Sequence, residues 1–333
     1  MRIIVDCMSG DNAPLEIVKG ACIGAKLHKV DVTLVGDKSR IEKIIADNSL
    51  DTTNIEIYDV QGESITMEDD PGVIIKDKKD SSMAQGFNLL KDGKGDAFVS
   101  AGNTGALLTG ATLIVKRVKG VRRAVLGAII PLGTPMLLVD SGAQTDCTAQ
   151  NLLQYATMGN LFMEKVMNVK NPRVGLINNG TEEHKGTELY QQTHQLLKQS
   201  GLNFVGNIEG RDIPQGVCDI IVADGFTGNI VLKLCEGAGI FVKNTLKTVF
   251  YKSIFTKLAA LLVKGSIKEI KKSMDYSEHG GAPFFGIAKP VIKAHGSSNA
   301  KSIAKCIEQA KNYAQSGIIE EFAAMSKAQD EVQ

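Results

Sequence analysis

The chain contains 333 residues, of which 43% are hydrophobic, and its 38 basic and 37 acidic residues leave a formal net charge of +1. This length and apolar content suffice for one large α/β core or two closely joined ones. The near-neutral charge and the absence of Trp argue against phosphate-backbone binding and base stacking, so we expect no nucleic-acid partner.

The sequence also points to a compartment. It begins on apolar residues without a signal-peptide pattern, and no apolar run reaches the roughly 18 residues that a bilayer-spanning helix needs. The six cysteines show neither Cys-x-x-Cys spacing nor a disulfide framework, which favours reduced thiols. We therefore predict a cytoplasmic protein.

Short runs rich in Val and Ile alternate with longer helical patterns along most of the chain. We predict strands over residues 2–6, 30–35, 55–60, 96–100, 123–130, 136–140, 173–178, 204–208 and 219–224. We predict helices near residues 14–27, 38–47, 82–91, 104–117, 148–167, 186–199, 228–250 and 299–325. This alternation indicates an α/β fold with a doubly wound, largely parallel sheet, taken here as a single catalytic unit over 1–333. Because such folds bind ligands at the carboxyl ends of their strands, candidate site residues are sought there.

The first predicted strand ends at Asp6, and a polar turn with Asp11 and Asn12 follows it. Pro14 is well placed as the first helical residue, so the turn is short. It is either a plain capped turn or a ligand-facing one. A basic run, Lys76-Asp-Lys-Lys-Asp-Ser-Ser82, then precedes the third predicted helix. Lys79 in this run offers an ammonium group to an anion, although charge runs are commonly solvated surface.

Two Gly-rich turns resemble each other. They are Val99-Ser-Ala-Gly-Asn-Thr-Gly-Ala-Leu107 and Val222-Ala-Asp-Gly-Phe-Thr-Gly-Asn-Ile230, and each directly follows an apolar strand. Glycines let the backbone approach a ligand, Thr or Asn can cap the next helix, and free amides at a helix start attract anions. A single copy would commonly serve packing alone, whereas two matching copies favour a pair of anion-facing turns.

Two further turns carry candidate polar groups. Gly180-Thr-Glu-Glu-His-Lys-Gly186 follows a predicted strand, but its reversed Lys-Gly order and the lack of a Lys-Ser or Lys-Thr pair argue against nucleotide hydrolysis. His295 opens the turn before the last long helix, where a histidine is either structural or catalytic. We find no metal-ligand spacing, no dinucleotide fingerprint and no Gly-x-Ser-x-Gly motif, so we expect no metal, no nicotinamide cofactor and no serine nucleophile.

Residues 243–276 interrupt the α/β alternation. Eight lysines and one acid lie between positions 243 and 272, and apolar residues recur at helical spacing on either side of Gly265. We predict a protruding helical hairpin made of two amphipathic helices hinged at Gly265. It could contact anionic lipid, dock an acidic protein, or pack at a dimer interface. Its candidate contact residues are Leu258, Leu261, Leu262, Lys264 and Lys268.

Taken together and in order, these motifs closely resemble the PlsX family, the phosphate acyltransferases of bacterial phospholipid synthesis. The resemblance covers nearly the whole chain and rests on Ile4–Pro14, Lys78–Met83, Ser100–Ala106, Asp224–Asn229, Gly280–Pro283 and Ile292–Ser298. Four positions depart from the usual family pattern: Ser9 and His184 stand where the family generally has Gly, Ser141 where it has Val, and Gln144 where it has Asn.

The resemblance implies a homodimeric enzyme with a fold similar to isocitrate and isopropylmalate dehydrogenases and to phosphate acetyltransferases. It implies transfer of a fatty acyl group from acyl carrier protein to inorganic phosphate. A membrane acyltransferase would then pass the acyl phosphate to glycerol 3-phosphate. No cofactor is expected, since the phosphopantetheine arm belongs to the carrier protein. The acidic carrier protein is accordingly the protein partner considered for the lysine-rich hairpin, and the lipid alternative would be a peripheral contact with the inner face of the cell membrane.

The reaction requires phosphate to be desolvated and oriented, and the carbonyl oxyanion to be stabilised. Phosphate is itself the nucleophile, so no protein nucleophile is needed. We predict that Lys185 and Asn229 act at the reacting centre. The predicted phosphate- or pantetheine-binding residues are Asp11, Asn12, Lys79, Ser100, Asn103, Thr104, Asp224, Thr227 and His295.

Three other functions were weighed. The nearest is an acyl-CoA-dependent phosphate acyltransferase of the acetyl or butyryl type. A β-decarboxylating dehydrogenase on the same fold is disfavoured, because no metal-binding carboxylate cluster and no cofactor fingerprint are present. A membrane-recruited scaffold would leave the paired Gly-rich turns without a role.

Overall fold

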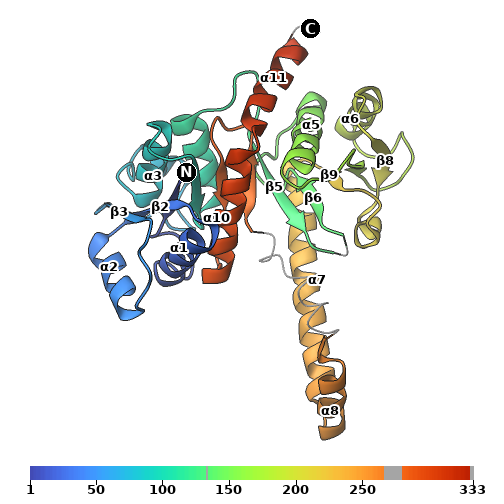
Figure 1. Ribbon diagram of the computed structural model, residues 1–333. Coiled ribbons are helices and arrows are strands. Elements are labelled where there is room, and N and C mark those ends of the chain that lie inside the picture. The colour runs from blue at the N-terminus through green and yellow to red at the C-terminus, as the bar shows by residue number, and fades with distance from the viewer. Residues whose placement is uncertain (133, 266–279, 331–333) are drawn as a thin grey trace. The chain divides into compact units, whose positions relative to one another are not determined.

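A computed structural model of the chain describes residues 1–132, 134–265 and 280–330. The chain divides into two compact units (Figure 1). Unit 1 comprises Met1–Gly127, Thr157–Lys170 and His279–Gln333, and unit 2 comprises Ala128–Ala156 and Asn171–Glu278. We expected the whole chain to act as a single catalytic unit, and joint action of the two compact units stays a prediction.

Unit 1 is built on a mostly parallel sheet with the strand order β3-β2-β1-β4-β11-β10-β5. Only β10 runs antiparallel, to both β11 and β5. The strands are β1 (Arg2–Asp6), β2 (Asp31–Gly36), β3 (Ile55–Asp59), β4 (Ala97–Ser100), β5 (Val125–Ile130), β10 (Ala282–Phe285) and β11 (Val291–Lys293). Every residue of β4 and β5 is buried, as expected of a sheet covered on both faces.

Helices pack closely on this sheet. Helix α1 (Leu15–His28) lies against α10 (Ala300–Gln315), and a Cβ added at Gly20 would meet the Ala300 carbonyl oxygen at 2.5 Å, so only glycine permits this approach. Helix α3 (Ser82–Lys91) packs on β1, β2 and β4. The other helical elements are α2 (Lys38–Asp47), η1 (Pro71–Ile75), α4 (Thr104–Gly110) with its π-helical continuation η2 (Ala111–Val115), and α11 (Ile318–Asp330). Strand β5 and helix α5 (Ala149–Lys165) carry the chain from one unit to the other.

Unit 2 contains a smaller parallel sheet with the order β6-β9-β7-β8. Its strands are β6 (Met136–Val139), β7 (Val174–Ile177), β8 (Phe204–Ile208) and β9 (Ile220–Val222). Its helical elements are α6 (Glu188–Gln199), η3 (Gly210–Gln215), α7 (Gly225–Tyr251) and α8 (Ile254–Leu262). The nine predicted strands are all confirmed, as is the largely parallel α/β architecture. Strands β10 and β11 were missed, because Gly and Pro residues within or directly before them are typical of turns.

The lysine-rich segment differs from its prediction. Helix α7 runs unbroken to Tyr251, and a break that was not predicted falls at Lys252 and Ser253. Helix α8 ends at Leu262, and the hinge at Gly265 stays a prediction. Ser253 starts α8 with a capping box, since its Oγ accepts from the Thr256 amide at 3.2 Å. Helix α8 then contacts α7 (Figure 1). Lys268 and the second predicted helix lie outside the described residues.

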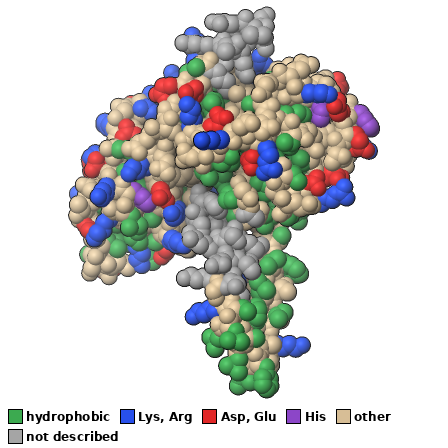
Figure 2. Space-filling view, turned by 45° about the vertical axis from the view of Figure 1, so that its right-hand side comes forward, with side chains coloured by type: hydrophobic (Ala, Val, Ile, Leu, Met, Phe, Trp, Pro, Cys, Tyr) green, Lys and Arg blue, Asp and Glu red, His purple; other side chains and the backbone are tan. Residues whose placement is uncertain are grey.

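By length and composition, α7 could cross a membrane, contrary to the expectation that no apolar run is long enough. That test alone does not make it a membrane span, because its first turn is packed into unit 2, with Gly225 and Gly228 buried. None of its residues beyond Gly228 is buried, nor is any residue of α8. Figure 2 shows hydrophobic side chains gathered on this segment with lysines at its margins.

Candidate functional site

Three turns meet at the carboxyl edge of the unit 1 sheet. Strands β1, β4 and β11 are parallel neighbours, so the turns that follow them start from the same edge. The Asp11 amide donates to the Gly296 carbonyl at 2.8 Å, and Asn12 Nδ2 donates to the Ser297 carbonyl at 3.1 Å. His295 Nδ1 lies 2.9 Å from Ser297 Oγ. The structure thus brings three predicted site residues, Asp11, Asn12 and His295, to one place.

A buried carboxylate fixes these turns. Asp6 at the end of β1 is fully buried and accepts the hydroxyls of Ser82 at 2.6 Å and Ser100 at 2.7 Å. Ser100 Oγ in turn accepts from the Gly102 amide at 3.1 Å. The hydroxyl proton of Ser100 is therefore committed to Asp6, and its contact with phosphate stays a prediction. Asp6 was not among the predicted site residues, although an acid ending a buried strand was a visible signal.

Asn103 caps the helix that begins at Thr104. Its Oδ1 accepts from the Ala106 amide at 3.1 Å, and its Nδ2 donates to the Met67 carbonyl at 3.0 Å. The side chain is therefore occupied within unit 1. The Thr104 hydroxyl forms no hydrogen bond with the part of the chain that the structure describes, and the first amides of a helix have no intrahelical acceptor. Because Asn103 binds the Ala106 amide, the groups that this turn leaves for an anion are the Thr104 hydroxyl and the amides of Thr104 and Gly105.

The basic run before α3 contains three lysines, of which Lys78 has different surroundings from the other two. Lys78 Nζ lies 2.8 Å from an Asp69 carboxylate oxygen and 3.0 Å from one of Glu63, and these contacts raise the pKa of Lys78. Lys76 and Lys79 are exposed and form no ion pair with a described residue. Both are therefore cations left for an anionic ligand, and the binding role of Lys79 stays a prediction.

The corresponding turn of unit 2 is capped by Asp224. Its carboxylate accepts from the Thr227 amide at 2.9 Å, the Thr227 hydroxyl at 2.8 Å and the Tyr190 hydroxyl at 2.5 Å. Burial alone would raise the pKa of Asp224, but hydrogen bonds led by that of Tyr190 lower it below its ordinary value. Both predicted residues, Asp224 and Thr227, thus hold the start of α7, and their contact with substrate stays a prediction.

This lowered pKa predicts a pH-dependent contribution to stability. A carboxyl whose pKa is lower in the folded state stabilises it above the unfolded pKa of about 3.9, and loses that effect as pH falls through the folded value. Asp224→Asn should therefore lower the free energy of unfolding by about 1–3 kcal/mol at pH 7. The difference from wild type should shrink below about pH 4. Urea unfolding of both proteins at pH 7 and pH 3.5 measures it, and an equal difference at both pH values would contradict the assignment.

A second buried carboxylate, Asp140, organises the turn after β6. It accepts from the amides of Gly142 at 3.0 Å and Gln144 at 2.7 Å. The Gln144 carbonyl accepts from the Gly225 amide at 2.8 Å, which ties this turn to α7. A Cβ at Gly228 would lie 1.8 Å from the Asp140 carbonyl oxygen. In unit 1, a Cβ at Gly105 would lie 2.5 Å from Pro71 Cγ, so the repeated glycine has a packing role in both units.

Lys185 and Asn229, predicted to act at the reacting centre, both lie in unit 2. Lys185 is half-buried in the loop after β7 and forms no ion pair with a described residue. Asn229 is exposed in the first turn of α7, and its side chain lies against Gly142. Unit 2 thus presents an unneutralised cation and an amide beside its carboxyl-edge turns.

Comparison with known proteins shows to which family the chain belongs. A family model described as "Fatty acid synthesis protein" matches residues 1–321. A phosphate acyltransferase of Thermoanaerobacterium thermosaccharolyticum is 46% identical over 320 residues, covering 96% of this chain and 95% of the relative. One of Acetivibrio thermocellus is 45% identical over 325 residues, covering 97% and 95%. The chain belongs to the PlsX family of phosphate acyltransferases. It is an enzyme that transfers an acyl group to phosphate.

Solved structures support the fold of this phosphate acyltransferase. A phosphotransacetylase from Streptococcus pyogenes superposes with a TM-score of 0.63 at 15% identity, covering 94% of each chain. A 4-hydroxythreonine-4-phosphate dehydrogenase from Salmonella typhimurium gives a TM-score of 0.55 at 11% identity, covering 93% of this chain and 98% of that one. At these identities the likeness concerns the fold alone, and it is consistent with the expected similarity in fold to phosphate acetyltransferases and dehydrogenases.

The departures from the family pattern fall at structured turns. The backbone carbonyls of Gln144 and His184 accept hydrogen bonds within these turns, and a residue of any type supplies such a carbonyl. Ser9 differs, because its Oγ is buried and has no hydrogen-bond partner among the described residues. Ser9 therefore places a desolvated hydroxyl beside Gly102 where the family generally has none.

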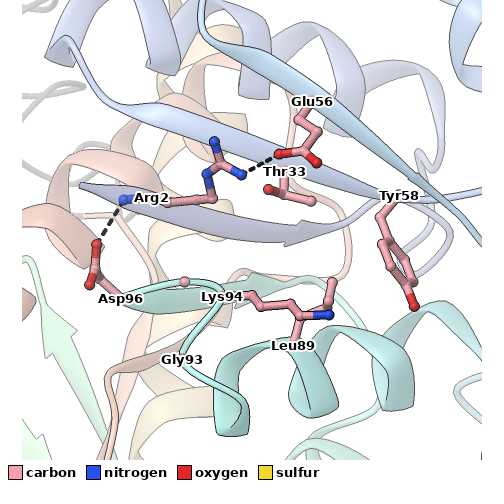
Figure 3. A pocket seen from close by; sticks show the side chains of 9 residues that line it. Arg2, Thr33, Glu56, Tyr58, Leu89, Gly93, Lys94 and Asp96 are labelled. Atoms are coloured by element: carbon pink, nitrogen blue, oxygen red, sulfur yellow. Dashed lines mark hydrogen bonds and ion pairs between the residues drawn. The ribbon is translucent and has the colours of Figure 1, made fainter.

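A pocket of about 470 Å³ lies elsewhere in unit 1, near the amino-terminal ends of β1 and β4 (Figure 3). Glu56 neutralises the Arg2 side chain there, and Asp96 accepts from the Arg2 amide at 2.8 Å. The pocket contains none of the predicted site residues. Among the residues that the structure describes, no group of three or more His, Cys, Asp or Glu is placed to hold a metal ion.

Proposed function

We propose that this phosphate acyltransferase takes a fatty acyl group from acyl carrier protein and forms acyl phosphate for phospholipid synthesis. The observation that carries the proposal is the match of residues 1–321 to a family described as a fatty acid synthesis protein, together with relatives named phosphate acyltransferase. Charge adds support for a carrier-protein donor, because residues 243–264 contain five lysines and no acid. An acidic carrier would be steered by such a surface.

In the proposed reaction, a phosphate oxygen attacks the thioester carbonyl carbon. The new C–O bond forms, the C–S bond breaks, and the sulfur leaves as the carrier's thiolate. A thiol pKa of about 8.5 makes this leaving group easy to release, so a strong general acid is not required. The carbonyl oxygen becomes negative during attack and needs cations or donors around it. No cofactor is proposed beyond the carrier's own phosphopantetheine arm.

Each unit presents groups suited to these charges at its carboxyl edge. Unit 1 offers Lys79, the Thr104 hydroxyl and the first amides of α4, and unit 2 offers Lys185 and Asn229. An ammonium ion and amides bind a phosphate dianion well, since charge-assisted hydrogen bonds are roughly twice as strong as neutral ones. Activity measured over a range of inorganic phosphate concentrations in Lys79→Ala and Lys185→Ala would show which lysine binds phosphate. The variant that has lost the phosphate-binding lysine should have the higher KM for phosphate.

The donor is tested directly. Purified enzyme with radiolabelled orthophosphate and palmitoyl-loaded carrier protein should release palmitoyl phosphate, while palmitoyl-CoA and acetyl-CoA at equal concentration should give little product. Equal or greater product from a CoA thioester would favour the acetyl- or butyryl-type alternative. The absence of acyl phosphate from every donor would remove the proposed function.

We also propose that α7 and α8 make the expected dimer and membrane contacts. Their exposed hydrophobic residues include Leu234, Phe241, Ile254, Phe255, Leu258 and Leu262. Exposed apolar patches of this extent mark interaction surfaces. A homodimer working in the cytoplasm and resting on the inner face of the cell membrane would deliver acyl phosphate to a membrane acyltransferase acting on glycerol 3-phosphate.

Leu258→Glu tests the membrane part of this proposal. A carboxylate at this exposed apolar position should weaken binding to anionic vesicles by roughly tenfold or more, because burial of the side chain is lost and charge repulsion is added. The measurement is flotation with vesicles of phosphatidylglycerol and phosphatidylcholine. Asn244→Glu, which adds the same charge at an exposed polar position of α7, is the matched control. Undiminished flotation of Leu258→Glu would leave carrier docking or dimer packing for this surface.

A further inference from the structure

The loop that carries Lys185 has no regular secondary structure, yet side chains hold its backbone. Residues 178–187 join β7 to α6. Asn178 Nδ2 donates to the carbonyl of Lys185 itself at 3.2 Å. Gln191 Nε2, on α6, donates to the carbonyls of His184 at 2.8 Å and Gly186 at 3.1 Å. Loops are usually mobile, but these hydrogen bonds restrict the position of the backbone from which the Lys185 side chain extends.

A fourth contact comes from the neighbouring strand. Asn207, on β8, donates from Nδ2 to the Glu182 carbonyl at 2.8 Å. Asn207 is 6% exposed, and its bond to the Glu182 carbonyl is part-buried. Asn207 is one of two attachments of this loop to β8, since the Ile208 carbonyl accepts from the Asn178 amide at 2.8 Å. It therefore ties the loop to a rigid element.

The orientation of the Asn207 amide is itself fixed. Its Oδ1 lies 2.9 Å from His194 Nδ1, and His194 is 4% exposed and packs its ring edge against Phe204. Because Oδ1 can only accept, His194 Nδ1 carries the hydrogen, and Nδ2 is left to point at the loop. On its other side, His194 Nε2 lies 3.8 Å from the Glu183 carboxylate, which pairs with Lys198 at 2.7 Å.

We infer that Asn207 is a positioning residue for Lys185, acting through the Glu182 carbonyl, and that it sets the rate of acyl transfer. This inference rests on the proposed function, because it takes Lys185 as a group that acts at the reacting centre. A reacting group displaced by about 1 Å can cost on the order of a hundredfold in rate. A buried donor that fixes the loop is placed to prevent such a displacement.

The test is Asn207→Asp. The carboxylate keeps the size of the side chain and an acceptor for His194, but it opposes the Glu182 carbonyl with a second oxygen. We expect kcat for acyl phosphate formation to fall roughly 10- to 100-fold, with KM for the acyl donor changed less than about threefold. Asn203→Asp is the matched control, since Asn203 lies just before the same strand and donates to the Asn171 carbonyl at 3.0 Å. It should keep kcat within about twofold of wild type.

A merely structural role is separated by a double-mutant cycle. In a Lys185→Ala background, Asn207→Asp should have little further effect on kcat, because the group that it positions is gone. Amide hydrogen exchange over 180–187 should quicken in Asn207→Asp and not in Asn203→Asp. Should Asn207→Asp fail to fold, Asn178→Asp removes the bond to the Lys185 carbonyl and should show the same non-additivity.

The outcomes distinguish the two proposals. Full additivity of Asn207→Asp and Lys185→Ala, with an active wild type, would overturn the positioning role and leave the proposed function standing. Wild-type kcat in Lys185→Ala would likewise overturn the positioning role alone. A wild type that forms no acyl phosphate from orthophosphate and acyl-loaded carrier would overturn the proposed function, and this inference with it.

Discussion

Replacement of Lys185 by alanine is expected to lower kcat for acyl phosphate formation by roughly 10²–10³-fold at saturating acyl donor. The expected loss is that of one preorganised donor aimed at a developing negative charge. Lys185 is suited to this role because it is half-buried, unpaired among the described residues, and rooted in a loop held by side-chain hydrogen bonds. Steady-state release of acyl phosphate, measured with saturating phosphate and carrier-bound palmitate, gives kcat directly.

The control for Lys185 is a lysine without a proposed role. Lys43→Ala removes an exposed ammonium group from α2 and should leave kcat within about twofold of wild type. Lys185→Arg should recover part of the activity, since it keeps the charge but changes the geometry. Activity of Lys185→Ala close to that of wild type would remove this residue from the mechanism.

The sequence predicted the elements of the site better than their contacts. Apolar strands followed by Gly, Asn and Thr placed the candidate turns at strand ends, and the structure confirms that each follows its strand. Hydrophobic periodicity is a local property, which is why β1, β4 and β9 were predictable. Strands β10 and β11 were not, because Gly280, Gly281, Pro283 and Pro290 within or beside them are typical of turns.

Polar partners distant along the chain could not be predicted. Ser82 and Ser100 lie 76 and 94 residues from Asp6, to which both donate. Nothing in the turn around Ser100 indicates that its hydroxyl is already bound. The same applies to Asp224, whose partner Tyr190 lies 34 residues away. Residue type at a strand end therefore predicts where polar groups gather, while burial and long-range pairing decide which of them remain for a ligand.

The break between α7 and α8 shows a related limit. Gly265 was the predicted hinge of the hairpin, and no break was predicted at Ser253. In the structure, Ser253 and Thr256 satisfy each other's backbone amides, which starts a new helix without any glycine. A capping box twelve residues earlier thus determines where the first break falls.

The second large expected effect is on stability, and it comes from a substitution in the Gly-rich turn of unit 2. Gly228→Ala is expected to lower the free energy of unfolding by about 3 kcal/mol or more. The new Cβ would lie 1.8 Å from the Asp140 carbonyl oxygen, and a backbone atom cannot move aside as a flexible side chain can. The displaced turn would also shift Asn229, the next residue, so kcat should fall as well. Urea unfolding followed by circular dichroism measures the change.

Gly237→Ala makes the same substitution in the same helix, nine residues on, where no atom lies within 4 Å of the added Cβ. Alanine is the better helix former by about 1 kcal/mol, so this variant should be as stable as wild type or more stable. The opposite signs expected for the two substitutions separate close packing from helix propensity. Equal unfolding midpoints for Gly228→Ala and Gly237→Ala would show that α7 does not pack on the Asp140 turn, and the spacing that the two Gly-rich turns share would then need another explanation than close contact.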